Sequence, residues 1–116
     1  MQPKPVAQKL AVRGRTGTVL VDPADVAWIE SAGNYVVLHT PGGEHMMRAT
    51  LDEILAQLGD GFVRISRSTL VNLAQVAALG ERTPQGDMTL TLRDGARLRL
   101  TRTYRHGALG RLPRPR

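Results

Sequence analysis

Short apolar segments separated by turn-forming residues constrain the fold of this chain more than any other feature of its sequence. The turns carry Gly, Pro, Asn or Asp, which suit the backbone conformations of tight turns. Two of the segments between them, residues 26–31 and 35–40, are rich in β-branched and aromatic residues, which are typical of strands. The expected strands are residues 9–13, 18–21, 26–31, 35–40, 44–48 and 76–79. The pattern therefore predicts a mostly β domain.

One clear helix is expected in the middle of the chain. Residues 50–53 read Thr-Leu-Asp-Glu, which is a capping box. In this motif the Thr50 hydroxyl accepts a hydrogen bond from the Glu53 backbone N–H, and the Glu53 carboxylate accepts one from the Thr50 backbone. Four apolar residues then recur at helical spacing until Gly59. The motif predicts a helix over Leu51–Leu58 whose apolar stripe belongs to the core.

The last patterned run, residues 88–102, alternates apolar residues with threonine and arginine. A two-residue turn at Asp94-Gly95 would mix the two faces of this hairpin. A three-residue loop that also includes Ala96 would pair Leu92 with Leu98 and keep the faces separate. One face is then apolar, and the other carries Thr91, Arg93, Arg97 and Arg99. Close arginines cost stability unless an anion lies nearby.

Charge is unevenly distributed along the 116 residues. All ten acidic residues lie between Asp22 and Asp94, and residues 95–116 contain seven arginines and no acid. A basic segment of this kind attracts a polyanion at long range. For residues 97–105, placed in a strand and the turn beyond it, we favour nucleic-acid contact over a solvated face. We expect residues 113–116 to be a solvated tail.

Composition argues against several other functions. The chain has no cysteine, which excludes disulfides and thiolate metal sites. The three histidines, His39, His45 and His106, have no metal-ligand spacing, so no metal is expected. Nothing near the serines supports nucleophilic catalysis, and neither an enzyme nor a cofactor is expected. With no long apolar run and no signal-peptide core, the chain is expected to be cytoplasmic without membrane contact.

The segment from Gly61 to Leu73 mixes two arginines, two serines and an asparagine with apolar residues. Such a mixture suits a surface that buries one side and holds phosphates or base edges with the other. Arg67 has no acidic neighbour in the sequence, so we favour DNA contact for it. Arg64 could instead pair with Glu53 or Asp60, and this alternative stays open.

Three further side chains have structural interpretations. We expect the Asn72 amide to hold the turn that follows Leu70 and Val71. Trp28, the only tryptophan, is expected in the core. Tyr104 could stack on a base or pack against the core, and packing is favoured.

Four motifs, in order along the chain, resemble those of the LytTR family of bacterial DNA-binding domains. They are Val26–Ser31 followed by Gly33–Val36, the Thr50–Leu58 helix, Arg64–Leu73, and Leu100–Tyr104. The likeness extends from about Leu10 to Leu112. We therefore expect a LytTR-type domain over residues 8–112, with flexible tails at 1–7 and 113–116.

The resemblance implies a mostly β fold, an elongated arrangement of small antiparallel sheets with a short helix. It also implies sequence-specific binding to double-stranded DNA in transcription regulation, with loops that enter successive grooves. The expected sites are direct repeats at promoters. The expected partner is a receiver or sensor domain, or a protein outside this chain. A monomer in solution is expected, and pairing on DNA is left open.

The family pattern and the basic strand together select twelve candidate DNA-contacting residues. An amide can read adenine and an arginine can read guanine, so Asn34 and Arg67 are expected to reach base edges. Thr103 stands where a second arginine is common, so a contact made there in relatives is expected to be missing or moved. The candidates are Asn34, Tyr35, Arg64, Ser66, Arg67, Ser68, Arg97, Arg99, Thr101, Arg102, Thr103 and Arg105.

Two other functions remain alternatives. One is an RNA or single-strand binding module, although such modules stack bases on exposed aromatic residues and this chain has four aromatic residues in all. The other is a small protein–protein adaptor with a basic tail. Binding to nucleic acid should weaken steeply with salt, whereas binding through an apolar patch should not.

Overall fold

Three antiparallel sheets and two α-helices make up the computed structural model, which describes residues 9–112. The strands are β1 (Leu10–Gly14), β2 (Gly17–Val21), β3 (Trp28–Ala32), β4 (Tyr35–Thr40), β5 (Gly43–Arg48), β6 (Phe62–Ser66), β7 (Thr69–Asn72), β8 (Val76–Leu79), β9 (Met88–Leu92) and β10 (Arg97–Leu100). The helices are α1 (Leu51–Leu58) and α2 (Arg102–Leu109). Single 3-10 turns lie at Pro23–Asp25, Gly59–Gly61 and Leu73–Gln75.

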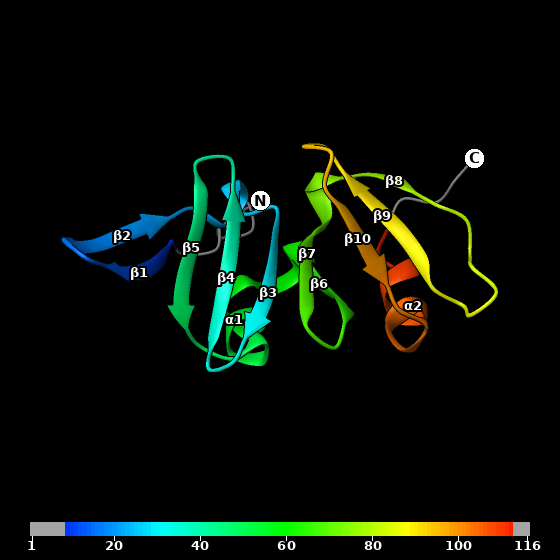
Figure 1. Cartoon of the computed structure of the whole chain (residues 1–116), viewed down its shortest axis with the longest axis horizontal. Helices are drawn as coiled ribbons and strands as arrows, with labels where there is room; N and C mark the ends of the chain where they lie inside the picture. The colour runs from blue at the N-terminus through cyan, green and yellow to red at the C-terminus, as the bar shows by residue number, and fades with distance from the viewer. Residues whose placement is uncertain (1–8, 113–116) are drawn as a thin grey trace, which may run out of the picture.

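The sheets follow one another along the molecule (Figure 1). The β1–β2 hairpin lies at one end, the five-stranded sheet β5-β4-β3-β7-β6 in the middle, and the three-stranded sheet β10-β9-β8 at the other end. Strand β7 pairs with β3 as well as with β6, so that Ile29 lies opposite Leu70. This pairing joins the two halves of the sequence in one sheet.

Two hydrophobic cores lie on opposite faces of the five-stranded sheet. Because side chains alternate along a strand, Leu70 packs into the core that contains α1, whereas Val71 packs into the core that contains α2. In β6, Phe62 belongs to the first core and Ile65 to the second. Strands β6 and β7 are therefore buried on both faces, whereas the sequence pattern suggested burial on one face only. Arg67 and Ser68, in the turn between the two strands, are exposed.

The structure confirms most of the expected elements. The β1–β2 hairpin, the strands over 35–40 and 76–79, and the helix over Leu51–Leu58 are present. The capping box has both of its hydrogen bonds. The strand expected at 26–31 starts later, at Trp28, because Val26 ends a 3-10 turn. The expected tails at 1–7 and 113–116 lie outside the described residues.

The expectation of a single helix is wrong. Helix α2 occupies Arg102–Leu109, where a turn was expected. Its cap residue, Thr101, makes no side-chain capping hydrogen bond, so the sequence lacks the local signal that marks α1. Arg102 and Arg105 consequently lie on a helix rather than on the turn beyond a strand.

The expected register of the β9–β10 hairpin is also wrong, although an odd loop is present. Leu98 pairs with Leu90, not with Leu92, and Leu92 N donates to the Ala96 carbonyl at 2.8 Å. The loop residues are thus 93–95, and Gly95 has a positive φ of 93°. Because the loop length is odd, threonines and arginines still share one face, as the pairing of Arg97 with Thr91 shows.

Trp28 is half-buried rather than fully in the core. Its ring packs against the second core and stacks on His39, with ring centroids 3.6 Å apart. Asn72 has the expected structural role, because its side chain is buried and its Nδ2 donates to the Val26 carbonyl at 2.9 Å. Its Oδ1 also accepts from Ala74 N at 3.0 Å.

Neither described helix has the length and apolar character of a membrane span. Within residues 9–112, no group of three potential metal ligands is close enough to hold an ion.

Candidate nucleic-acid interface

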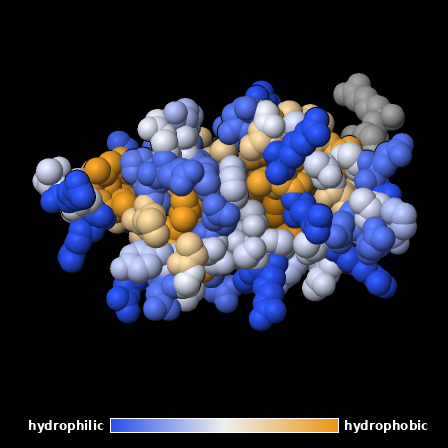
Figure 2. Space-filling view, viewed as in Figure 1, coloured by the Kyte–Doolittle hydropathy of each residue, from blue (hydrophilic) through white to orange (hydrophobic). Residues whose placement is uncertain are grey.

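Three segments that are distant in the sequence meet along one edge of the molecule. They are the β3–β4 turn, the β6–β7 turn and the start of α2, which lie along the lower edge in Figure 1. Ser31 N donates to the Ser68 carbonyl at 2.9 Å, which joins the first segment to the second. Thr101 N donates to the Ile65 carbonyl at 2.9 Å, which joins the third. Figure 2 shows hydrophilic side chains along this edge.

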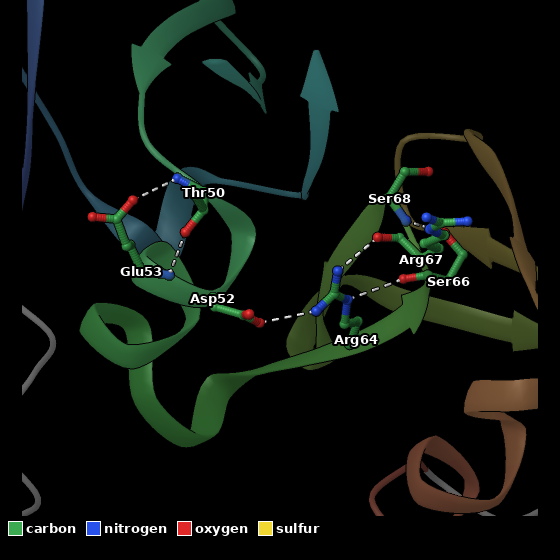
Figure 3. A network of polar contacts seen from close by, with 7 residues as sticks. All are labelled: Thr50, Asp52, Glu53, Arg64, Ser66, Arg67 and Ser68. Carbon is green, nitrogen blue, oxygen red and sulfur yellow. Dashed lines mark hydrogen bonds and ion pairs between the residues drawn. The ribbon is translucent and has the colours of Figure 1, made fainter. Parts of the chain in front are cut away.

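Arg64 holds the β6–β7 turn from within (Figure 3). Its Nη2 donates to the Arg67 carbonyl at 2.6 Å, and its Nε donates to the Ser66 carbonyl at 3.3 Å. Its Nη1 pairs with Asp52 of α1 at 2.9 Å. Asp52 is not one of the two partners suggested by the sequence, Glu53 and Asp60. The Glu53 carboxylate instead accepts from Thr50 N in the capping box. Arg64 therefore supports the turn that presents its neighbours.

The guanidinium of Arg64 also lies over the ring of Tyr104, 5.6 Å from the ring centroid. Tyr104 belongs to α2 and packs against the second core, as the favoured interpretation expected. A cation over an aromatic face is attracted to it. Through Arg64, the turn is thus tied both to α1 and to α2.

Arg67 differs from Arg64, because its side chain does not hold the turn. Its backbone carbonyl is held by Arg64, but its side chain is exposed and makes no hydrogen bond or ion pair with any other described residue. Beside it, Ser66 Oγ accepts from Ser68 N at 3.2 Å, which closes the turn. An unpaired guanidinium on a supported backbone can bind an anion or a base edge with little reorganisation.

An open pocket of about 590 Å³ lies between the β6–β7 turn and the start of α2. Arg67 and Arg99 supply guanidinium groups at its walls, and no acidic residue lines it. The lining residues are Ser66, Arg67, Ser68, Thr69, Leu98, Arg99, Thr101, Thr103 and Tyr104. Hydroxyl and guanidinium donors without a carboxylate suit a phosphate or the acceptor atoms of a base.

The remaining basic candidates differ in how far they are occupied. Arg105 is half-buried, and its Nη1 donates to the Gly86 carbonyl at 2.6 Å. Arg99 Nε lies 3.9 Å from Asp87 Oδ2, which is a loose ion pair. Arg97 and Arg102 are exposed, and within residues 9–112 their side chains have no hydrogen-bond or ion-pair partner.

Asn34 and Tyr35 lie in and just after the β3–β4 turn, and both are exposed. Gly33 takes a positive φ of 64° there, which a turn of this shape requires. Neither residue lines the pocket. They are on the same edge, but they form a separate contact point.

Sequence reasoning missed the residues that hold the interface in place. Asp52 pairs with Arg64 across twelve positions, and Asp87 contacts the start of α2 across fifteen. No local motif marks such pairs. The alternation placed Leu98 on the apolar face of the hairpin, and only the fold shows that it lines the pocket.

Comparison with known proteins points to one family of DNA-binding domains. The model of the LytTr DNA-binding domain family matches residues 16–109. Among solved structures, the fold is similar to a chain from Bacillus cereus described as the LytTr DNA-binding domain of a methyl-accepting/DNA response regulator. The TM-score is 0.80 at 19% identity, and the match covers 89% of this chain and 94% of that one. No curated protein matches.

Proposed function

Because this chain belongs to the LytTR family of DNA-binding domains, we propose that it binds double-stranded DNA along the edge formed by the β3–β4 turn, the β6–β7 turn and the start of α2. Domains of this family are the DNA-binding parts of bacterial response regulators. Binding of DNA is therefore the function of the chain. What remains to be assigned is the role of each side chain.

The observation that carries this assignment is the state of Arg67. It is exposed and unpaired among the described residues, it lines the pocket, and its backbone is held by Arg64. A guanidinium can pair with both O6 and N7 of guanine, and such a pair discriminates between bases by about 1–3 kcal/mol. We assign base readout to Arg67 for this reason.

The other candidates divide into contacting and supporting residues. We assign Ser66, Ser68 and Thr103 to phosphate oxygens, to which their hydroxyl groups would donate, a contact that positions a protein without reading sequence. Arg97, Arg99 and Arg102 are assigned to phosphates as well. The Thr101 hydroxyl donates to the Ile65 carbonyl at 3.4 Å, so Thr101 is assigned a supporting role. Arg64 and Arg105 are assigned supporting roles, because their guanidinium groups already hold backbone carbonyls.

Asn34 is proposed as a second reading residue. Its amide lies in a different turn from Arg67, outside the pocket. An amide can donate to N7 and accept from N6 of adenine. Tyr35, beside it and 42% exposed, would contact the backbone or a base face.

Several broader features are proposed from the family resemblance. The DNA sites would be direct repeats at promoters, bound by a protein that is monomeric in solution. A receiver or sensor domain, or a separate protein, would supply the regulatory signal. A DNA-binding role favours a cytoplasmic location.

Selection of bound duplexes from a random pool, followed by measurement of single-base variants at fixed salt, tests the proposal. Arg67→Ala should relax the preference at one cluster of positions by about 1–3 kcal/mol. Asn34→Ala should do so at another cluster, and the two effects should add. Arg15→Ala is the matched control, because Arg15 is exposed in the β1–β2 turn at the end of the molecule.

Arg15→Ala should leave the ranking of sites unchanged. A uniform loss of affinity in Arg67→Ala, with the wild-type ranking of sites kept, would make Arg67 a phosphate contact. Wild-type protein that selects no duplex from the pool would refute the proposed function itself.

A further inference from the structure

The loop between β8 and β9 reaches across to α2. It closes on itself through Thr83, whose N donates to the Asp87 carbonyl at 2.7 Å and whose Oγ1 accepts from Asp87 N at 3.1 Å. Gly86 in this loop is buried against α2, where an added Cβ would lie 3.1 Å from Arg105 Nη1 and 3.2 Å from Arg102 Cδ. Glycine is needed there for both space and its φ of 93°.

The Asp87 carboxylate makes two contacts from this loop. Oδ1 accepts from the backbone N of Arg102, the first residue of α2, at 2.9 Å. Oδ2 lies 3.9 Å from Arg99 Nε. The first contact replaces the capping hydrogen bond that Thr101 does not make, and a carboxylate is favourable at a helix N-terminus.

We infer that Asp87 positions the start of α2 for DNA binding and that its charge also restrains Arg99, so that DNA phosphate must displace Asp87 to gain Arg99. The inference rests on the proposed function, since it concerns the same edge. Thr101, Arg99 and Thr103 all line the pocket with Arg67, and Asp87 touches the chain on both sides of Thr101.

The geometry allows this exchange. The side chain of Asp87 is 25% exposed and that of Arg99 is 75% exposed. An ion pair this long and this open is weak, whereas a DNA phosphate lies in a dense line of negative charge. Phosphate and the Asp87 carboxylate therefore compete for Arg99, and DNA binding is weaker than it would be without the carboxylate.

Asp87→Asn separates the two roles, because its amide oxygen can still accept from Arg102 N while its charge is gone. We expect Asp87→Asn to bind a selected duplex about two- to fivefold more tightly at low salt. The slope of log affinity against log salt should steepen by about one, since one more phosphate contact is gained. Fluorescence anisotropy over a range of salt concentrations measures both.

Glu81→Gln is the matched control. Glu81 lies in the same loop and is exposed, and in the described part of the chain it has no hydrogen-bond or ion-pair partner. The substitution removes the same charge without touching Arg99 or α2. It should raise affinity less than Asp87→Asn and leave the slope unchanged.

A double-mutant cycle with Arg99→Ala completes the test. In the Arg99→Ala background, Asp87→Asn should raise the affinity for the duplex no more than Glu81→Gln does. The inference would be overturned if Asp87→Asn and Glu81→Gln raised the affinity equally. It would also be overturned if the larger gain from Asp87→Asn persisted in the Arg99→Ala background. An unfolded Asp87→Asn protein would overturn it too, because the amide offers the same acceptor to α2. Loss of all binding by the wild type would refute the proposed function, and the inference with it.

Discussion

Helices α1 and α2 have the same length, eight residues, but they begin in different ways. Helix α1 is capped by its own sequence, through the two hydrogen bonds between Thr50 and Glu53. Helix α2 has no side-chain cap of its own and takes a carboxylate oxygen from Asp87, fifteen positions earlier. One helix start is local, and the other is made by the tertiary structure.

The two helices also differ in what they bury. Helix α1 buries Leu51, Ile54 and Leu58, whereas the fully buried residue of α2 is Ala108. Helices this short are marginal in isolation and depend on packing. Helix α1 is therefore a core element that fixes the sheet, while α2 depends on its neighbours. Helix α2, which depends more on its neighbours, thus lies at the proposed DNA-binding edge.

The largest expected effect is on the packing of α1. Ile54 has no exposed surface, so Ile54→Ala should lower the free energy of unfolding by about 2–5 kcal/mol. Ala108→Gly in α2 is the comparison, and its cost should be about 1–2 kcal/mol from helix propensity and one lost methyl group. Urea denaturation measures both. If both substitutions lowered the free energy of unfolding equally, α1 would not be the more deeply packed helix.

The second effect concerns the cap of α2. Asp87→Ala should lower the free energy of unfolding by about 1–2 kcal/mol, because a charge-assisted hydrogen bond at a helix N-terminus is lost. Amide hydrogen exchange should accelerate in α2 and not in α1. Thr50→Ala should cost about 1 kcal/mol and do the reverse. Faster exchange in both helices after either change would show that the starts are coupled.

The smallest effect is on pH dependence in α1. Hydrogen bonds from the backbone N–H and then the hydroxyl of Thr50 hold the pKa of Glu53 below its ordinary value. A lowered pKa in the folded state gives stability that is present above the unfolded pKa and is lost as pH falls through the folded pKa. Glu53→Gln should thus differ most from wild type near neutral pH.

Thermal unfolding from about pH 6 to about pH 3 measures this difference, which should shrink as pH falls. In a Thr50→Ala background, which lacks the hydroxyl, the stability difference that Glu53→Gln makes should depend less on pH. A difference that grows as the solution becomes more acidic would contradict the assignment.

Much of the fold followed from patterns that extend over a few residues. Alternation predicted the strands, and the odd loop between β9 and β10 kept threonine and arginine on one face. The exact pairing was wrong by two residues, because the three-residue loop lies at 93–95 and not at 94–96, and there Asp94 Oδ1 accepts from Ala96 N. Alternation sets which face a residue takes, but turn chemistry sets its partner.

The candidate site divides in a similar way. The sequence picked out Arg67 as an arginine without an acidic neighbour, and the structure leaves its side chain unpaired among the described residues. The sequence left Arg64, three positions earlier in the same motif, open between DNA contact and an ion pair with Glu53 or Asp60. The distinction depends on Asp52 and Tyr104, which reach Arg64 from α1 and α2.

The sequence by itself thus determined most of the strands, helix α1 and the family. Each depends on interactions between residues close in the chain, or on a pattern that any partner surface would satisfy. Only the tertiary structure decided helix α2, the roles of Arg64 and Arg105, and the pocket. These depend on hydrogen bonds such as that from Thr101 to Ile65, thirty-six positions away. Such partners meet only when the sheets have packed, and no local pattern specifies them.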